Sequence, residues 1–188
     1  MTKKYYPWGG EFTECNPKSS IAVVLLNIDY TPTSEVAIYG PLKTENIGIE
    51  KIVANIISNP NIRYILICGE EIRGHRSGES LIALNKYGIN SKNKIKNAPG
   101  AIPYIENLEN DAIKRFQKQI DIVDLIGIKD IKKIENKINS LIKDKIKPFG
   151  KPYIAIRIKS KIKTIDDKRA LHSKIIINYM GKVKKRGS

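Results

Sequence analysis

The sequence predicts a mostly parallel α/β sheet with helices on both faces. Short, continuous apolar runs, such as residues 21–28 and 63–68, are typical of strands that are buried on both sides. Amphipathic segments with a helical period, such as residues 46–57 and 130–145, separate or follow such runs. Strands and helices that alternate along a chain favour a three-layer sandwich around a parallel central sheet. At 188 residues, the chain can bury a substantial core.

The first half of the chain supplies five of the expected elements. We expect, in order, two strands, a helix, a strand and a helix over residues 21–28, 36–39, 46–57, 63–68 and 77–86. Asn46 and Ser77 open the two helices as N-cap residues, because their side chains can accept hydrogen bonds from first-turn amides. Pro60 and Gly88 stand where the two helices must end.

The alternation of strands and helices continues to residue 145. After a polar, turn-rich stretch, we expect a helix, a strand and a long helix over residues 109–119, 121–127 and 130–145. The long helix carries one apolar stripe, formed by Ile131, Ile134, Ile138, Leu141 and Ile142. This stripe predicts one more helix packed on the sheet.

Proline and glycine at residues 148–152 divide the chain. The division predicts a domain over residues 1–147 and an extension over residues 148–188, in which we expect a strand at 153–158, a helix at 166–180 and a frayed basic end. Residues 129–188 carry 19 Lys and Arg against 5 Asp and Glu, whereas residues 1–128 carry 15 against 14. A solvated surface is the commonest reason for such a basic segment, and contact with an anionic membrane surface or a nucleic acid stays open.

Several classes of protein lose support because their motifs are absent. Cys15 and Cys68 match no metal spacing, and no signal-peptide pattern or apolar run of about 20 residues is present. We therefore expect a cytoplasmic protein with free thiols and without a membrane span. The sequence has no Gly-x-Gly-x-x-Gly, Walker or Gly-x-Ser-x-Gly motif. A bound cofactor is therefore expected to supply any reactivity.

The loop between the strand at 63–68 and the helix at 77–86 carries His75, one of two histidines. Open α/β sheets bind ligands at the carboxyl ends of their strands, where this loop lies. His75 and Gly78 match the end of an Asp-x-His-x-x-Gly pattern, which in many corrinoid-binding domains brings a histidine under cobalt, but Arg73 replaces the aspartate. Because a ligating histidine usually bonds a carboxylate or carbonyl through its other nitrogen, that partner must come from elsewhere or be missing. A loop histidine that bonds to the backbone is the commoner alternative.

The neighbours of His75 also allow more than one interpretation. Glu70 and Glu71 are either an acid–base pair or a surface ion cluster with Arg73 and Arg76. If the serine at position 77 caps the helix, the next two amides point to a site for an anionic or polar ligand group. The second histidine, at position 172, is expected on the surface of the basic extension.

Several separated blocks of residues together resemble one family, the corrinoid-carrying A subunit of the tetrahydromethanopterin S-methyltransferase of methanogenic archaea. The resemblance runs from about residue 5 to residue 146, and the blocks stand in the family's order. The blocks are Tyr6-Pro7-Trp8, Cys15-Asn16-Pro17, Gly69-Glu70-Glu71 with Gly74-His75 and Ser77-Gly78, Gly100-Ala101-Ile102-Pro103-Tyr104-Ile105-Glu106-Asn107, and Arg115-Phe116-Gln117. Blocks in a shared order are more specific than any one of them.

The resemblance implies a Rossmann-like domain that binds a cobamide, either 5-hydroxybenzimidazolylcobamide or cobalamin, with His75 as the axial ligand of cobalt. It also implies that other residues of the matching blocks contact the cofactor, namely Gly69, Glu70, Gly74, Ser77, Gly78, Gly100, Ala101, Ile102 and Pro103. No residue of this chain is expected to have a catalytic role of its own.

In the family, a methyl group moves from methyl-tetrahydromethanopterin through cobalt to coenzyme M, and the A subunit is the carrier. Other subunits catalyse the transfers, and the membrane part couples them to sodium export. Typical members end in a linker and a hydrophobic membrane helix, whereas this chain has its basic extension after Gly150. Either the anchor is missing or the chain is a soluble paralogue, and the ordered pattern of residues 153–180 favours the paralogue.

Two functions of other classes stay open beside the methyl carrier, which is the leading hypothesis. A soluble corrinoid sensor or store would bind cobamide without accepting methyl groups. A nucleic-acid binder would use residues 150–188 and would bind more weakly in salt. That segment has few aromatic side chains among its lysines, only Tyr153 and Tyr179, so we do not expect nucleic acid as the partner.

Overall fold

Two compact units make up the chain, residues 1–158 and residues 159–188. The computed structural model describes residues 5–143, 146–156, 175–177 and 183–185. The first unit contains the sheet and helices on which the candidate site is built. None of the helices within these described ranges is long and apolar enough to cross a membrane.

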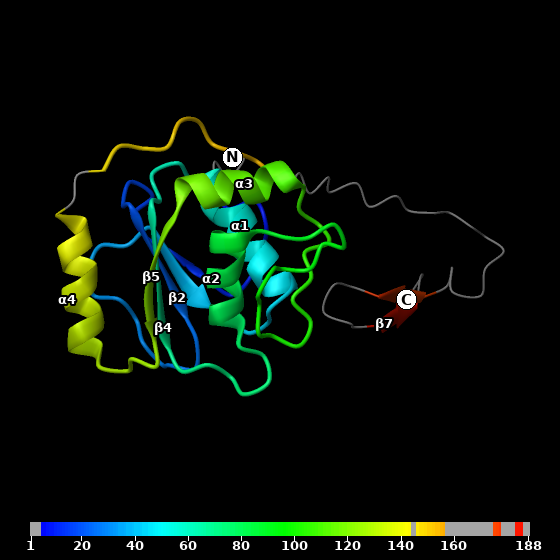
Figure 1. Ribbon diagram of the computed structural model, residues 1–188, viewed down its shortest axis with the longest axis horizontal. Coiled ribbons are helices and arrows are strands. Elements are labelled where there is room, and N and C mark those ends of the chain that lie inside the picture. The colour runs from blue at the N-terminus through cyan, green and yellow to red at the C-terminus, as the bar shows by residue number, and fades with distance from the viewer. Residues whose placement is uncertain (1–4, 144–145, 157–174, 178–182, 186–188) are drawn as a thin grey trace. The chain divides into compact units, whose positions relative to one another are not determined.

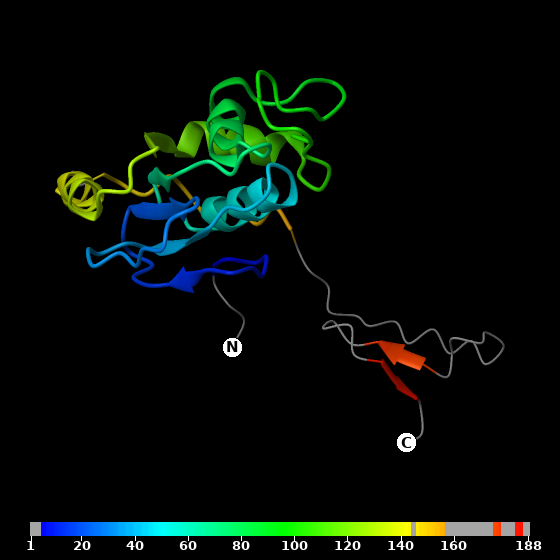
Figure 2. The ribbon, with the colours of Figure 1, turned by 90° about the horizontal axis from the view of Figure 1, so that it is seen from below.

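A five-stranded sheet forms the centre of the first unit, with the strand order β1-β3-β2-β4-β5. The strands are β1 (Thr13–Glu14), β2 (Ile21–Leu25), β3 (Ile38–Pro41), β4 (Tyr64–Gly69) and β5 (Asp121–Ile126). All neighbouring pairs from β3 to β5 are parallel, whereas β1 pairs with β3 in the antiparallel direction at the outer edge (Figure 2). The prediction of a mostly parallel α/β sheet is confirmed.

Within the described residues, four helices cover the two faces of this sheet. They are α1 (Ile47–Ser58), α2 (Ser77–Tyr87), α3 (Asn110–Gln119) and α4 (Ile131–Ile142). The first three lie on one face and α4 lies on the other, so that the unit has three layers (Figure 1). The predicted three-layer sandwich is therefore confirmed.

The core has two halves because successive side chains of a strand point to opposite faces. Along β2, alternate residues contribute to the half beneath α1, α2 and α3, namely Ala22 and Val24. The residues between them pack under α4, namely Ile21, Val23 and Leu25. The continuous apolar run in the sequence is thus explained by a strand that is covered on both sides.

Three of the expected helix ends are confirmed. The Asn46 side chain accepts a hydrogen bond from the Ile47 amide at 2.7 Å and caps α1. Asp130 caps α4 by accepting hydrogen bonds from two first-turn amides. Gly88 ends α2 with a φ of 67°, a conformation that glycine adopts more easily than other residues.

The expected N-cap of α2 is wrong. Arg76, in the left-handed conformation with a φ of 42°, precedes the helix, and Ser77 is its first residue. Ser77 is fully buried, and its hydroxyl donates to the Leu42 carbonyl at 3.4 Å, so it faces the core instead of the first-turn amides. Another side chain performs the capping, as described below.

The bounds of β2 and β3 also differ from expectation. β2 ends at Leu25, three residues before its expected end, and β3 continues through Gly40 and Pro41, two residues beyond its expected end. At Gly40, an added Cβ would lie 2.6 Å from the carbonyl oxygen of Glu11, so the N-terminal segment crosses here closely. β1, which is two residues long, is too short to show any period in the sequence.

Two expectations for the C-terminal part are wrong where it is described. Residues 153–156 form no strand; the Tyr153 amide donates instead to the Ile57 carbonyl at 3.1 Å. β6 (Ile175–Ile177) lies where a helix was expected, and it pairs in the antiparallel direction with β7 (Val183–Lys185). Three consecutive isoleucines favour a strand, because β-branched side chains lose less freedom there. Residues 157–174, including His172, and residues 178–182 lie outside the described residues, and the division at residue 147 stays a prediction.

Both cysteines are free, as expected. Cys15 is exposed, whereas Cys68 is buried in β4. Burial raises the pKa of the Cys68 thiol to about 12. The thiol therefore stays protonated near neutral pH and serves as a packing group.

Candidate functional site

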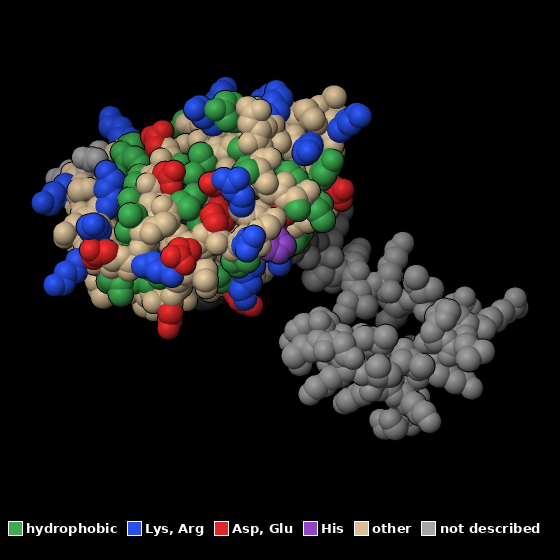
Figure 3. All heavy atoms as spheres, turned by 60° about the horizontal axis from the view of Figure 1, so that its bottom comes forward, with side chains coloured by type: hydrophobic (Ala, Val, Ile, Leu, Met, Phe, Trp, Pro, Cys, Tyr) green, Lys and Arg blue, Asp and Glu red, His purple; other side chains and the backbone are tan. Residues whose placement is uncertain are grey.

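His75 lies in the loop of residues 70–76, which joins the carboxyl end of β4 to the start of α2. Its side chain is 51% exposed, and the histidine coloured in Figure 3 stands at the surface of the first unit. The His75 amide donates to the Ile72 carbonyl at 3.0 Å, so a local turn fixes the backbone. The structure thus places the imidazole at the edge of the sheet where parallel α/β folds bind ligands.

The partner of His75 is Glu45, in the loop between β3 and α1. His75 Nδ1 lies 3.0 Å from Glu45 Oε2, and the Glu45 side chain is only 4% exposed. The sequence left open whether a carboxylate or carbonyl partner comes from another part of the chain or is missing, and Glu45 was not among the predicted residues. One signal was available, because Glu45 follows a predicted strand and its loop must therefore reach the same edge of the sheet.

Hydrogen bonds keep Glu45 ionised. Burial acts to raise its pKa, but hydrogen bonds from the Ile102 amide and from His75 outweigh burial and hold the pKa below its usual range. An ionised carboxylate can only accept, so His75 Nδ1 must carry the hydrogen of this bond. The other ring nitrogen, Nε2, then keeps its lone pair when the imidazole is neutral, which is the form that binds metals.

A second loop, residues 98–105, completes this side of the site and is called the Gly100 loop here. The Ile102 amide donates to Glu45 Oε1 at 3.0 Å, and the Gly100 amide donates to the Ser80 hydroxyl at 3.3 Å. Ile102 is 60% exposed. Ala101 is exposed as well, whereas Pro103 is buried. Three of the residues predicted to contact a cofactor, His75, Gly100 and Ile102, are therefore brought together, through a residue that was not predicted.

A groove of about 270 Å³ lies between the start of α1 and the Gly100 loop with the residues that follow it, Glu106 and Asn107. Its lining residues are Asn46, Ile47, Glu50, Ile102, Tyr104, Glu106 and Asn107. The buried Glu50 carboxylate anchors one wall by accepting hydrogen bonds from the Glu106 and Asn107 amides. Exposed apolar side chains form the rim, Ile47, Ile102 and Tyr104. The surface next to Glu45 and His75 therefore suits a ligand with a large apolar face.

The N-terminus of α2 is already filled by a side chain of the same loop. Glu71 Oε1 accepts a hydrogen bond from the Glu79 amide at 2.7 Å, and the Ser77 and Gly78 amides also donate to this carboxylate. Burial nevertheless raises the pKa of Glu71, because its desolvation outweighs these bonds. The amides that were expected to suit a ligand group thus hold an internal carboxylate, which caps the helix in place of Ser77.

The remaining predicted residues of the loop have structural surroundings. Glu70 forms an ion pair with Lys129 at 2.7 Å, whereas Glu71 accepts from the Glu79 amide, so the two carboxylates have different partners. Gly69 and Gly74 adopt φ values of 95° and 91°, which L side chains rarely take. At Gly78, an added Cβ would meet three side chains at 2.9 to 3.1 Å, so close packing requires glycine there. Their predicted contacts with a cofactor stay predictions.

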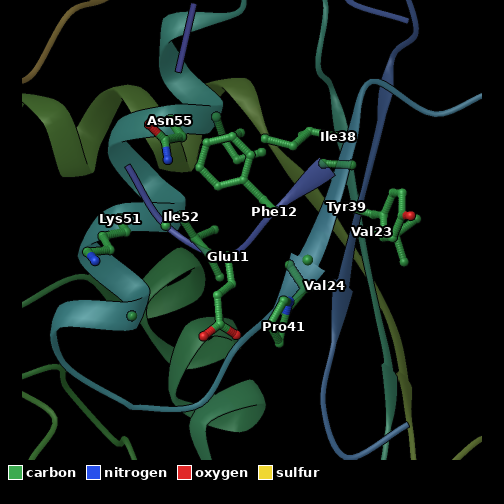
Figure 4. A pocket seen from close by; sticks show the side chains of 15 residues that line it. Glu11, Phe12, Val23, Val24, Ile38, Tyr39, Pro41, Lys51, Ile52 and Asn55 are labelled. Carbon is green, nitrogen blue, oxygen red and sulfur yellow. The ribbon is translucent and has the colours of Figure 1, made fainter. Parts of the chain in front are cut away.

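A second hollow lies between α1 and β3. Figure 4 shows the Phe12 ring between the helix and Ile38, and the lining is mainly apolar. Among its polar side chains, Asn55 is already satisfied, since it accepts from the Trp8 amide at 2.8 Å and donates to the Trp8 carbonyl at 2.7 Å. No residue of the loop 70–76 lines this hollow, which is therefore separate from His75.

The sequence also matches a known family over most of its length. Residues 2–166 match the model of the family described as the A subunit of tetrahydromethanopterin S-methyltransferase. This chain belongs to that family. The match includes both halves of the site, the loop of His75 and the Gly100 loop, and it confirms the resemblance found from the separated blocks.

Named relatives of the family agree with this assignment. A Methanosarcina barkeri protein, named as the A subunit of a candidate methyltransferase, Mtx, is 50% identical over 66% of this chain and 64% of its own length. The tetrahydromethanopterin S-methyltransferase A subunit of Methanohalophilus mahii is 48% identical over 70% of this chain and 56% of its own length. The A subunit numbered 1 of the same enzyme in Methanothermobacter thermautotrophicus is 38% identical over 95% of this chain and 80% of its own length. The chain thus spans less than two thirds of the length of the first two relatives.

Proposed function

We propose that this chain is the cobamide-binding methyl carrier of a methyltransferase that moves a methyl group from methyl-tetrahydromethanopterin to coenzyme M. Membership of the family and the geometry of His75 support the proposal. A bound cobamide would supply the methyl chemistry, because its cobalt can accept and give up a methyl group. The residues of this chain bind and orient that cofactor, and other subunits are the proposed catalysts.

The observation that carries the proposal is the environment of the imidazole. A buried carboxylate holds His75 Nδ1 at 3.0 Å, while half of the side chain is exposed to solvent. This is the arrangement in which a histidine ligates a metal through its second nitrogen, with the carboxylate fixing the tautomer and raising the basicity of the ligand. His75 would thus be the residue of this chain that holds the cobalt of a bound cobamide.

The surroundings also fit a flat macrocycle better than a small ion. The apolar side chains of Ile72 and Ile102 are 39% and 60% exposed, and both belong to the two loops that flank His75. Exposed apolar groups around a polar centre are typical of a ligand site. The described residues contain no group of three or more His, Cys, Asp and Glu side chains that could hold a metal ion.

Paramagnetic resonance of the cob(II)alamin complex tests the proposal. The chain is labelled with ¹⁵N-histidine, and we expect the axial nitrogen splitting of Co(II) to change from the triplet of ¹⁴N to the doublet of ¹⁵N. His75→Ala should abolish the doublet. The matched control, His172→Ala, should keep it. A triplet in the labelled wild-type protein would show that the axial nitrogen does not come from a histidine of this chain, and would overturn the proposal.

Methyl acceptance separates the carrier from a corrinoid store. With the purified methyl-tetrahydromethanopterin-dependent partner subunits, a carrier should acquire one methyl group per bound cobamide. A sensor or store would retain the cofactor and remain unmethylated. The His75→Ala protein, loaded with the same cofactor, is the comparison that shows whether the ligand matters for acceptance.

A further inference from the structure

The outer face of α4 carries a row of lysines. The inner face of this helix belongs to the core, where Ile134, Ile138 and Leu141 are buried. The outward side chains of the helix and its C-cap are exposed lysines and small polar groups, namely Lys132, Lys133, Asn136, Lys137, Ser140 and Lys143. Figure 3 shows blue Lys and Arg side chains at the left end of the unit, where Figure 1 places α4. The helix thus presents a cationic face to its surroundings.

The acidic residues that lie next to this face in the sequence are engaged elsewhere. Asp130 caps the first turn of α4 by accepting hydrogen bonds from two backbone amides. Glu135 accepts hydrogen bonds from the loop between β2 and β3. Glu70 pairs at 2.7 Å with Lys129, which precedes the helix. Among the described residues, none forms an ion pair with the four exposed lysines of the face. Their positive charge is therefore not neutralised within this part of the chain.

This arrangement of charge does not serve the stability of the helix. Lys132 and Lys133 lie in its first turn, where the helix dipole favours acidic side chains. Lys133 and Lys137 are four residues apart, a spacing at which like charges repel each other. The helices α1, α2 and α3 each have an acidic residue in the first turn, whereas α4 has none. An anionic partner outside the chain would offset this repulsion.

The composition of the face indicates which anionic partner it suits. Specific protein interfaces are poor in lysine and depend on aromatic and arginine side chains, and this face has neither. Proteins that bind nucleic acids also use arginine forks and aromatic platforms. Lysine is a flexible point charge, so a row of lysines suits a diffuse negative surface that demands no fixed geometry. A membrane surface with anionic lipids has this property.

We propose that the outer face of α4 binds the surface of a membrane that contains anionic lipids. The contact is electrostatic and superficial, because the apolar stripe of α4 is packed in the core and cannot insert between lipids. α4 covers the face of the sheet opposite α1, α2 and α3, whereas the loop of His75 lies at the carboxyl ends of the strands (Figure 1). A membrane along α4 therefore leaves this loop accessible. The proposal does not depend on the proposed function.

Binding of the full chain to vesicles tests the proposal. Vesicles of equal parts of phosphatidylglycerol and phosphatidylcholine provide the anionic surface, and vesicles of phosphatidylcholine alone are the neutral reference. We expect the chain to float with the first kind and not with the second. Added salt should release it, because the screening length is about 10 Å at 0.1 M ionic strength. A chain that does not bind the anionic vesicles would refute the proposal.

Neutralising three of the lysines measures the contribution of α4. Each lysine close to an anionic membrane strengthens binding by about fivefold. The triple variant Lys132→Gln, Lys133→Gln and Lys137→Gln should therefore lose about 100-fold in affinity for the anionic vesicles. Its urea unfolding midpoint should equal or exceed that of the wild type, because the variant has less repulsion along the helix. The loss of binding is then separated from any loss of folding.

The matched control removes the same charge from the other side of the unit. Lys92, Lys94 and Lys96 are exposed in the loop after α2, which lies on the side away from α4 in both ribbon views (Figures 1 and 2). The triple change of these lysines to glutamine keeps α4 and the basic extension intact. We expect it to lose less than about threefold in affinity. Equal losses in the two triple variants would assign binding to the net charge or to the extension, and would refute the role of α4.

The same variants separate a membrane from a nucleic acid. A fluorescent DNA duplex takes the place of the vesicles at the same salt concentration. Weaker binding to the vesicles without a comparable loss on the duplex supports the proposal. If the α4 variant instead weakens duplex binding by about 100-fold and leaves vesicle binding unchanged, the face is a nucleic-acid site and the proposal is wrong.

Discussion

The two ends of the parallel strands, called the carboxyl edge and the amino edge here, hold irregular segments in different ways. Glutamates accept hydrogen bonds at one edge, and arginines donate them at the other. At the carboxyl edge, Glu45, Glu50 and Glu71 accept hydrogen bonds from backbone amides. At the amino edge, Arg63 and Arg115 donate to backbone carbonyls of the segment after residue 146. This segment, drawn in orange, runs along the upper side of the first unit in Figure 1, opposite the loops that follow the strands.

The arginine-held segment is fixed through both its backbone and one ring. Arg115 donates to the Phe149 carbonyl at 2.6 Å and to the Lys151 carbonyl at 2.8 Å. The guanidinium carbons of Arg63 and Arg115 also lie 5.3 and 4.8 Å from the centre of the Phe149 ring. Because a guanidinium has no acceptor and stays charged, these contacts persist over the whole physiological pH range.

This difference between the two edges explains which of them can support a ligand site. A carboxylate has two oxygens with several lone pairs, so Glu45 can hold a loop and still orient an imidazole. An arginine has only donors, so it cannot orient an imidazole by accepting the hydrogen of a ring nitrogen. The glutamate-held edge therefore supports a ligand site, and the arginine-held edge anchors the chain.

The largest expected effect on stability comes from removing the hydrogen bonds of Gln119 at the amino edge. This side chain is fully buried. Its Nε2 donates to the carbonyls of Asn59 and Ile62 at 3.0 Å, and its Oε1 accepts from Arg115 Nε at 2.8 Å. Gln119→Leu should lower the free energy of unfolding by about 3 kcal/mol, because it leaves several buried groups unpaired. Urea unfolding measures this loss. Gln117→Leu, on the same helix and only half-buried, should cost about 1 kcal/mol, and equal losses would contradict the argument.

The next effect tests the glutamate-held edge by crowding it. Gly100→Ala places a Cβ within 2.8 Å of Glu45, His75 and Ser80, and overpacking of this kind costs about 2 kcal/mol. The same variant should disturb the tautomer of His75, as seen in its imidazole ¹⁵N shifts. Gly9→Ala is the control, since an added Cβ there meets nothing within 4 Å and should change stability by less than about 0.5 kcal/mol. A stable Gly100→Ala protein with native shifts would show that the loops can separate freely.

The smallest expected effect is a loss of stability at low pH, which a carboxylate can cause and an arginine cannot. It comes from Glu135, which holds the loop between β2 and β3. Glu135 accepts from the Tyr30 hydroxyl at 2.5 Å and from the Thr33 amide at 2.7 Å. Burial acts to raise its pKa, but these bonds and those from Ser34 lower it to about 2. Since the pKa of the folded state lies below the ordinary 4.5, the stabilisation is complete above pH 4.5 and is lost as the pH falls towards 2.

Glu135→Gln removes this pH-dependent contribution. We expect it to cost about 1.5 kcal/mol at pH 7, because one amide oxygen cannot replace four accepted hydrogen bonds. The difference from the wild type should fall to less than half by pH 3, as measured by urea unfolding at both values. A difference that is independent of pH would show that the bonds do not depend on the ionised carboxylate.

Much of the fold could be predicted because it depends on local periodicity. The runs at β2 and β4 are apolar on both faces, and the apolar stripe of α4 repeats with the helical period. The pattern of each element therefore predicts which of its faces are buried. The failures lie where local preference is weak or overridden. β1 is two residues long, and Ser77 has the right side chain for a cap but turns into the core because Glu71 takes that role.

By itself, the sequence determined the layers of the fold, the place of His75 at the carboxyl end of a strand and the family to which the chain belongs. These follow from patterns of neighbouring residues and from blocks in a shared order. Only the tertiary structure decided that Glu45, 30 residues away, is the partner of His75, and that Ile102 shares the same carboxylate. The physical reason is that the bond joins loops after different strands, and the register of those strands sets the distance between side chains that no local pattern relates.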